Sequence, residues 1–96
     1  MSEVIVIATI VAKADSIDTV KAELLKLVET TIKEPGCNSY LLHCDQSAPA
    51  TFVFYENWSS AAHLQSHMET EHFTQCFATI EELIENTVIQ ELTQLS

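Results

Sequence analysis

The sequence contains no arginine, and its four basic residues are all lysines, set against 14 acidic residues for a formal net charge of −10. Such a charge excludes most nucleic-acid partners, because binding to a phosphate backbone depends on clustered lysine and arginine. It also argues against anionic membrane surfaces and against substrates held by a guanidinium on a phosphate or carboxylate. We therefore expect no nucleic-acid or membrane partner, and a small ligand that is neutral or weakly charged.

Glycine, proline and cysteine are scarce as well, at 1, 2 and 3 residues. A chain of 96 residues that is 47% hydrophobic and so poor in glycine and proline is expected to form one domain over residues 1–96. The three cysteines form no CxxC pair, which is typical of reduced thiols. The sequence has no apolar run of about 20 residues and no basic leader with a cleavage site, so we expect a cytoplasmic protein.

Hydrophobic periodicity predicts alternating strands and helices along the chain. The β-branched run at residues 4–12 is typical of a central strand covered on both faces. A helix is expected from about Asp15 to Glu34-Pro35-Gly36, where proline disfavours helical geometry in the preceding residue and glycine permits a terminal turn. The remaining elements are expected to be strands at 37–45 and 51–58, a helix capped by Ser59, a bend near Thr70-Glu71, a helical pattern through Phe73, Phe77, Ile80 and Ile84, and a strand from about 87 to 95.

The resulting order, β-α-β-β-α-β, is that of a ferredoxin-like α+β fold, in which helices cover one face of an antiparallel sheet. The second face of the sheet is left without a cover. A second copy of so short and apolar a chain would cover it with the least additional structure, which predicts a symmetric homodimer.

One carboxylate is expected in apolar surroundings. Glu56 shares a strand face with Phe52, Phe54 and Trp58, because alternate residues of a strand point to the same side. A carboxylate there is costly to desolvate unless it is paired, and such groups often have a raised pKa at functional sites. Alternatively, the strand ends at Glu56 and the carboxylate reaches water. On the preceding strand, His43 either lines a cavity or lies at the sheet edge.

The histidines are candidates for proton transfer near neutral pH. Helical geometry places His67 at the border of the apolar arc formed by Ala61, Leu64 and Met68, so that it can point inward or serve as a structural residue bonded to backbone. His63 and His67 are four residues apart and could hold a metal with a third ligand. No HExxH pattern or cysteine cluster accompanies them, so a solvated helix face is the preferred interpretation and no metal is expected. Glycine-rich phosphate loops and dinucleotide fingerprints are absent, and we expect no organic cofactor either.

Two segments, EPGCNSYLLHCD and PATFVFYENWSSAAHLQSHMETEHFTQC, carry a family resemblance. They resemble the pattern E-x-G-C-x-x-Y, followed by E-x-W and H-x-x-T-x-H-F, of the antibiotic biosynthesis monooxygenase domain, in particular its quinol monooxygenase branch. The resemblance covers residues 34–77. It implies a dimeric α+β barrel whose members oxidise quinols, anthrones or related polyketides with O2, without metal, flavin or haem.

The resemblance also implies site residues. His67 would be the general base, with Glu56 and His72 as proton-handling groups. Trp58 would line the pocket and Asn57 would donate a hydrogen bond to a substrate oxygen. Strand positions add His43 and Phe54 to the expected substrate-binding residues. A rival interpretation is a dimeric barrel without oxygenase activity that binds or isomerises a small hydrophobic or carbonyl metabolite. A purely structural domain would have no cavity, so the discriminating feature is whether His67 and Glu56 face a common one.

Overall fold

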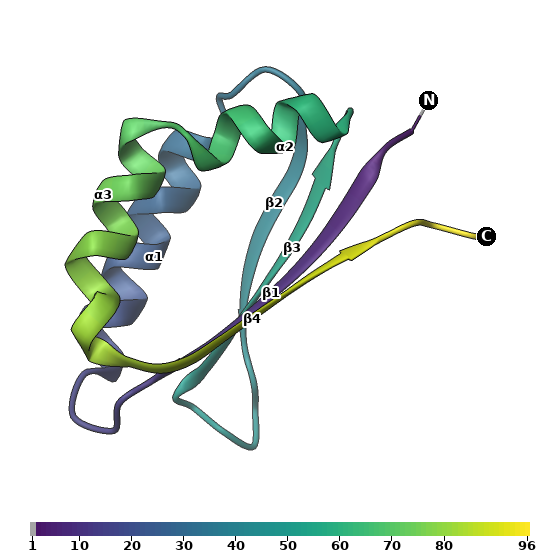
Figure 1. Cartoon of the computed structure of the whole chain (residues 1–96). Coiled ribbons are helices and arrows are strands. Elements are labelled where there is room, and N and C mark those ends of the chain that lie inside the picture. Colours follow the sequence, from purple (N-terminus) through teal and green to yellow (C-terminus); the bar gives the residue numbers. More distant parts are fainter. Residues whose placement is uncertain (1) are drawn as a thin grey trace.

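The computed structural model describes residues 2–96, which form one sheet with helices on one side of it (Figure 1). The strand order is β2-β3-β1-β4, and every neighbouring pair is antiparallel. The ferredoxin-like α+β prediction is therefore confirmed. The elements are β1 (Val4–Ala12), α1 (Ile17–Thr31), β2 (Cys37–Cys44), β3 (Thr51–Trp58), α2 (Ala61–Met68), α3 (Glu71–Ile80), a 3₁₀ turn (Glu81–Leu83) and β4 (Ile84–Leu92).

The core lies between the sheet and the helices, and strand alternation decides which residues enter it. On β3, every second residue from Phe52 to Trp58 is buried, and the intervening residues are only half-buried. Helix α1 contributes Val20, Leu24 and Leu27, which lie on one face at helical spacing. The helices thus cover the centre of the sheet, and the helix-facing side of β3 becomes the floor of the interior.

The fourth strand differs from its predicted limits. It begins at Ile84 and ends at Leu92, whereas the sequence suggests a start near residue 87 and a continuation to 95. Ile84 also belongs to this strand and not to the preceding helical pattern, because α3 ends at Ile80 and the 3₁₀ turn intervenes. The long central strand β1 sets these limits, since β4 pairs with it from Ala12 opposite Ile84 to Ile5 opposite Leu92.

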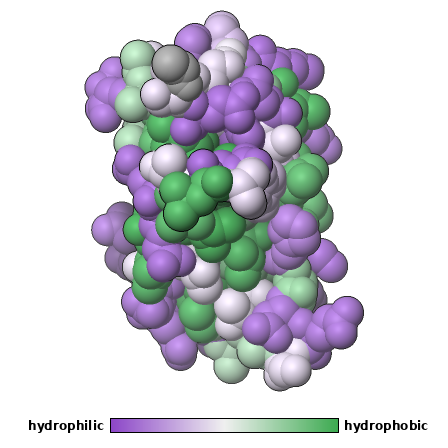
Figure 2. All heavy atoms as spheres, turned by 90° about the vertical axis from the view of Figure 1, so that its right-hand side faces the viewer, coloured by the Kyte–Doolittle hydropathy of each residue, from purple (hydrophilic) through white to green (hydrophobic). Residues whose placement is uncertain are grey.

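The face of the sheet away from the helices is uncovered and apolar at its centre. Figure 2 shows hydrophobic side chains gathered in the middle of this side of the molecule, with hydrophilic ones around them. Leu41 and Val88 are 53% and 47% exposed, and strand alternation places Ile7, Val53 and Tyr55 on the same face. None of the helices within residues 2–96 is long and apolar enough to cross a membrane.

Candidate active site

A small apolar cavity of ≈ 30 Å³ lies between the sheet and helices α2 and α3. This volume accommodates about one or two water molecules, whereas pockets for drug-sized ligands are roughly 300 Å³ or more. An aromatic ligand would therefore enter only if lining side chains move. The lining residues are Val6, Ala8, Tyr40, Phe54, Glu56, Leu64, His67, Met68, Phe73, Phe77, Ile89 and Glu91.

Glu56 reaches the cavity from β3 and is only 5% exposed, so the alternative that its carboxylate reaches water is wrong. Trp58, two residues further on the same strand face, donates its indole N–H to Glu56 Oε1 at 2.9 Å. Burial raises the pKa of Glu56 to about 7, and the Trp58 hydrogen bond opposes that rise. Near neutral pH the carboxyl group is consequently present in both protonation states.

His67 reaches the same cavity from α2 and is 1% exposed. Its ring lies against Trp58 and Phe73, with centroid distances of 4.7 Å and 5.0 Å. Nδ1 lies 2.8 Å from Glu34 Oε2, and Nε2 is buried without a hydrogen-bond partner among residues 2–96. Burial, the largest effect, lowers the pKa of His67, so the neutral imidazole is favoured.

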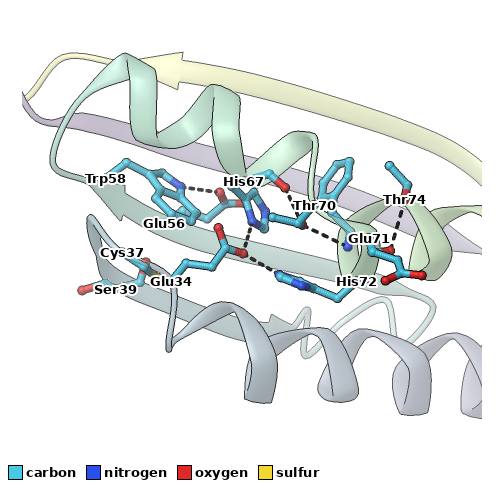
Figure 3. Close-up of polar contacts among 11 residues, drawn as sticks. Glu34, Cys37, Ser39, Glu56, Trp58, His67, Thr70, Glu71, His72 and Thr74 are labelled. Atoms are coloured by element: carbon cyan, nitrogen blue, oxygen red, sulfur yellow. Dashed lines mark hydrogen bonds and ion pairs between the residues drawn. The ribbon is translucent and has the colours of Figure 1, made fainter.

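Glu34 is positioned by the turn that follows α1. Gly36 in this turn has a backbone φ of 80°, which residues with a side chain rarely adopt, and a Cβ there would overlap the His63 ring. Its carbonyl accepts the Ser59 backbone N–H at 2.8 Å, which ties the turn to the chain entering α2. The glycine therefore permits the close approach that brings Glu34 to His67, and Glu34 Oε2 also lies 2.6 Å from His72 Nε2 (Figure 3).

The junction between α2 and α3 fixes the two histidines relative to each other. Thr70 donates its hydroxyl to the His67 carbonyl at 2.7 Å and accepts the Phe73 backbone N–H at 3.3 Å. It thus closes one helix and caps the next with a single side chain. This explains the spacing H-x-x-T-x-H-F, because the bend at Thr70 places His67 and His72 on two sides of Glu34 (Figure 3).

Two residues predicted for the site, Asn57 and His43, lie elsewhere. Asn57 is on the opposite sheet face, where its amide accepts from Asn38 at 3.0 Å and donates to Glu3 at 3.2 Å. His43 is exposed on the edge strand β2, with its ring 3.1 Å from the Val53 carbonyl oxygen. Neither residue lines the cavity. Their strand positions explain this, since residues adjacent to inward-pointing positions face outward.

The other predicted residues are brought together, with different contacts. Phe54, Glu56 and His67 line the cavity directly. Trp58 contributes through its contacts with Glu56 and the His67 ring, and His72 through Glu34.

The structure adds three residues that the sequence reasoning did not select: Glu34, Tyr40 and Glu91. Glu34 opens the E-x-G-C motif of the family resemblance, which is the signal for it, but the sequence alone assigns Glu34 no role beyond the end of a helix. Burial holds the pKa of Tyr40 well above its usual range, so that it stays a phenol. Glu91 and Glu56 both pair with Val6, from opposite sides. That shared register places both carboxylates on the cavity side. No sequence pattern specifies the pairing of Glu91 with Val6.

One group of side chains within residues 2–96 has donor atoms close enough to hold a metal ion, namely Glu34, His67 and His72, whose atoms lie within 4.8 Å of one another. The hydrogen bonds among these atoms account for their proximity without an ion. His63, which the sequence suggests as a second ligand beside His67, does not belong to this group, and its Nδ1 lies 2.9 Å from Ser60 Oγ.

Comparisons with known proteins identify the family and the fold of this chain. Residues 3–79 match the family described as antibiotic biosynthesis monooxygenase. PA3566 from Pseudomonas aeruginosa is 33% identical, with a TM-score of 0.95 over 100% of this chain and 97% of that one. A crystal structure of an antibiotic biosynthesis monooxygenase is 35% identical, with a TM-score of 0.92 over 97% and 99%. The "Probable quinol monooxygenase YgiN" of Escherichia coli (strain K12) is 36% identical over 58 residues, 52% of this chain and 56% of that protein. The chain thus matches just over half the length of this curated relative.

Proposed function

Because this chain belongs to the antibiotic biosynthesis monooxygenase family, we propose that it is a cofactor-independent monooxygenase that oxidises a quinol-like or polyketide-like aromatic with O2. One observation carries the proposal: His67 is a buried imidazole whose Nε2 has no partner among residues 2–96, and it shares an aromatic cavity with Glu56. A quinol hydroxyl in that cavity would meet a base held away from water. The match to a probable quinol monooxygenase supports the same substrate class.

The reaction requires a base more than it requires a cofactor. His67 Nε2 accepts the hydroxyl proton, and the quinolate anion that forms is electron-rich enough to reduce O2. One oxygen atom then bonds to a ring carbon. The other leaves as water when the O–O bond breaks, with one proton returned by the His67 imidazolium and the second released from the ring carbon that became oxygenated. A dihydroxyarene and O2 are thereby converted into a hydroxyquinone and one water, and the aromatic walls protect the anion from bulk solvent.

Glu56 complements this base on the floor of the cavity. With a pKa of about 7 it is present near neutral pH as both carboxyl and carboxylate. The protonated form can donate a hydrogen bond to a quinol or quinone oxygen, whereas an ionised form would repel a quinolate. We therefore assign to Glu56 the orientation of the second substrate oxygen, with Trp58 holding its Oε1 at 2.9 Å.

Oxygen uptake tests the proposal. The panel contains reduced naphthoquinols and anthrones, measured with a chelator and corrected for autoxidation. Uptake should require folded protein and should fall on the order of 100-fold in His67→Ala, the typical loss of a general base. Gln65→Ala, on the exposed face of the same helix, is the matched control and should keep native activity. Uptake that is equal in His67→Ala and native protein would refute the assignment of the base.

The presence of His67 and Glu56 in one cavity also supports a second candidate function, the isomerisation of a small carbonyl compound. A neutral imidazole and a protonated carboxyl group can together remove a proton beside a carbonyl and hydrogen-bond the enol oxygen. Solvent deuterium should then enter the carbon next to the carbonyl without any oxygen uptake. Deuterium exchange that depends on His67, in the absence of oxygen consumption, would select this function over the monooxygenase.

We also propose that two copies pair through the uncovered sheet face. Its exposed apolar centre, which includes Leu41 and Val88, would be removed from water in such a dimer (Figure 2). Sedimentation should give a dimer at micromolar concentration, and Val53→Lys on the same face should shift it to monomer. A native protein that sediments as a monomer would contradict this proposal.

The free cysteines, Cys37, Cys44 and Cys76, support the further proposal of a reducing, cytoplasmic location.

A further inference from the structure

The Glu34 carboxylate contacts two histidines with a single oxygen. Glu34 Oε2 lies 2.8 Å from His67 Nδ1 and 2.6 Å from His72 Nε2 (Figure 3). The Glu34 and His67 side chains are 11% and 2% exposed, whereas the His72 side chain is 27% exposed. His72 lines a groove between α1 and α3 and not the cavity. The three residues therefore run from the cavity, through a carboxylate, to the groove on the outer surface.

This geometry determines which nitrogen of His67 carries the proton. A neutral imidazole has one N–H, and an ionised carboxylate can only accept hydrogen bonds. The contact with Glu34 therefore requires the N–H at Nδ1, which leaves the lone pair at Nε2. Nε2 is also the nitrogen without a partner among residues 2–96. In the opposite tautomer, Nε2 would carry the proton and would be unable to accept another one.

We infer that Glu34 is a positioning residue that holds His67 in the Nδ1–H tautomer, so that Nε2 is kept as the proton acceptor of the cavity. This inference rests on the proposed function for its catalytic consequence, but the tautomer itself does not depend on any reaction. When His67 accepts a proton, the charge of the imidazolium forms 2.8 Å from Glu34 Oε2, which stabilises it in a buried site.

His72 anchors Glu34 from the other side. Because its Nε2 shares the oxygen that His67 uses, rotation of the carboxylate toward solvent would break both contacts. His72 does not line the cavity, and its ring centroid lies 6.3 Å from that of His67, so its hydrogen-bonded contact with the site is through Glu34. Removing it should loosen the carboxylate without abolishing the restraint on His67.

Nitrogen-15 NMR tests the tautomer directly. Native protein should show His67 with the proton on Nδ1 and an unprotonated Nε2. In Glu34→Gln the side-chain amide can donate as well as accept, so His67 should shift partly or wholly to the Nε2–H form. Glu34→Asp, which keeps a carboxylate, should retain more of the native form, and Glu29→Gln, exposed on α1, is the matched control and should retain all of it. Trp58 fluorescence confirms that each variant is folded. An Nε2–H tautomer in native protein, or an unchanged tautomer in Glu34→Gln, would overturn the inference.

Kinetics give the second readout. Glu34→Gln should lower kcat by about 100-fold or more with little change in KM, since the loss is in proton acceptance and not in binding. His72→Gln should lower kcat by roughly 10-fold, the size of effect that indirect partners typically have. A Glu34→Gln variant with an altered tautomer and native kcat would refute the catalytic part alone. If native protein consumed no oxygen, the proposed function would fail, and the NMR result would still decide the tautomer.

Discussion

Replacing Glu56 by glutamine should make the protein more stable at alkaline pH. The native carboxyl group is 5% exposed, and burial raises its pKa to about 7 from an ordinary value of 4.5. A carboxyl group whose pKa is raised in the folded state contributes its full stability when the pH is below its pKa in the unfolded state. This contribution is lost as the pH rises through its pKa in the folded state. The glutamine side chain of Glu56→Gln would stay neutral throughout and could still accept the Trp58 indole N–H.

The magnitude follows from the two pKa values. At about 1.36 kcal/mol per pKa unit, ionisation of Glu56 destabilises the folded state by about 3 kcal/mol once the pH is well above 7. Roughly 2 kcal/mol of this change falls between pH 5.5 and pH 9, a range that avoids the sequence pI of ≈ 4.5. The free-energy difference between Glu56→Gln and native protein should therefore grow by about 2 kcal/mol across that range.

Urea denaturation at fixed protein concentration measures this difference. Trp58 is the single tryptophan and is fully buried, so its fluorescence reports unfolding. Glu82→Gln, which removes the same charge from an exposed position after α3, controls for the general effect of charge. A difference between Glu56→Gln and native protein that stays constant from pH 5.5 to 9 would refute the raised pKa of Glu56.

Three further predictions concern individual contacts. Because burial lowers the pKa of His67, the acid limb of the kcat/KM profile should lie below pH 6.5 or so, and a limb above that value would count against His67 as the base. Trp58→Phe removes the N–H that lowers the pKa of Glu56, so that pKa should rise further, as measured by carbon-13 NMR. An unchanged pKa would mean that the hydrogen bond has no influence on it. Gly36→Ala should lower the free energy of unfolding by at least about 1 kcal/mol in urea titrations, since φ is 80° and a Cβ would overlap the His63 ring; native stability would contradict that clash.

The strands and helices with a strong hydrophobic period could be predicted closely. The expected strand at 51–58 coincides with β3, Thr51–Trp58, because its buried residues alternate without exception. The last strand could not be predicted as well. All of its residues after Ile84 are exposed, so its sequence contains little burial pattern. Its limits come from pairing along β1, which is a property of the sheet and not of the segment.

The candidate site was predictable where it depends on local geometry. Strand alternation places Glu56 among aromatic side chains, and helical spacing turns His67 inward. The same alternation places Asn57 and His43 on the outer face. The family resemblance suggests Asn57 for the pocket, and the strand position of His43 leaves open both a cavity and the sheet edge. Glu34 could not be located by spacing, because it meets a residue 33 positions later through the turn after α1.

The opposite pKa shifts of Glu56 and His67 have one cause and one chemical consequence. Burial penalises charge, so it raises the pKa of the carboxyl group and lowers that of the imidazole. Both groups are pushed toward their neutral forms, although the chain as a whole has a net charge of −10. Their shared cavity of ≈ 30 Å³ would admit the neutral aromatic of the proposed reaction once lining side chains move. When a proton moves to His67, the positive charge that forms on the imidazole lies 2.8 Å from Glu34 Oε2. In the monooxygenase that we propose, this arrangement would stabilise the transfer of the proton more than it stabilises the bound substrate, which is what distinguishes a catalyst from a binding pocket.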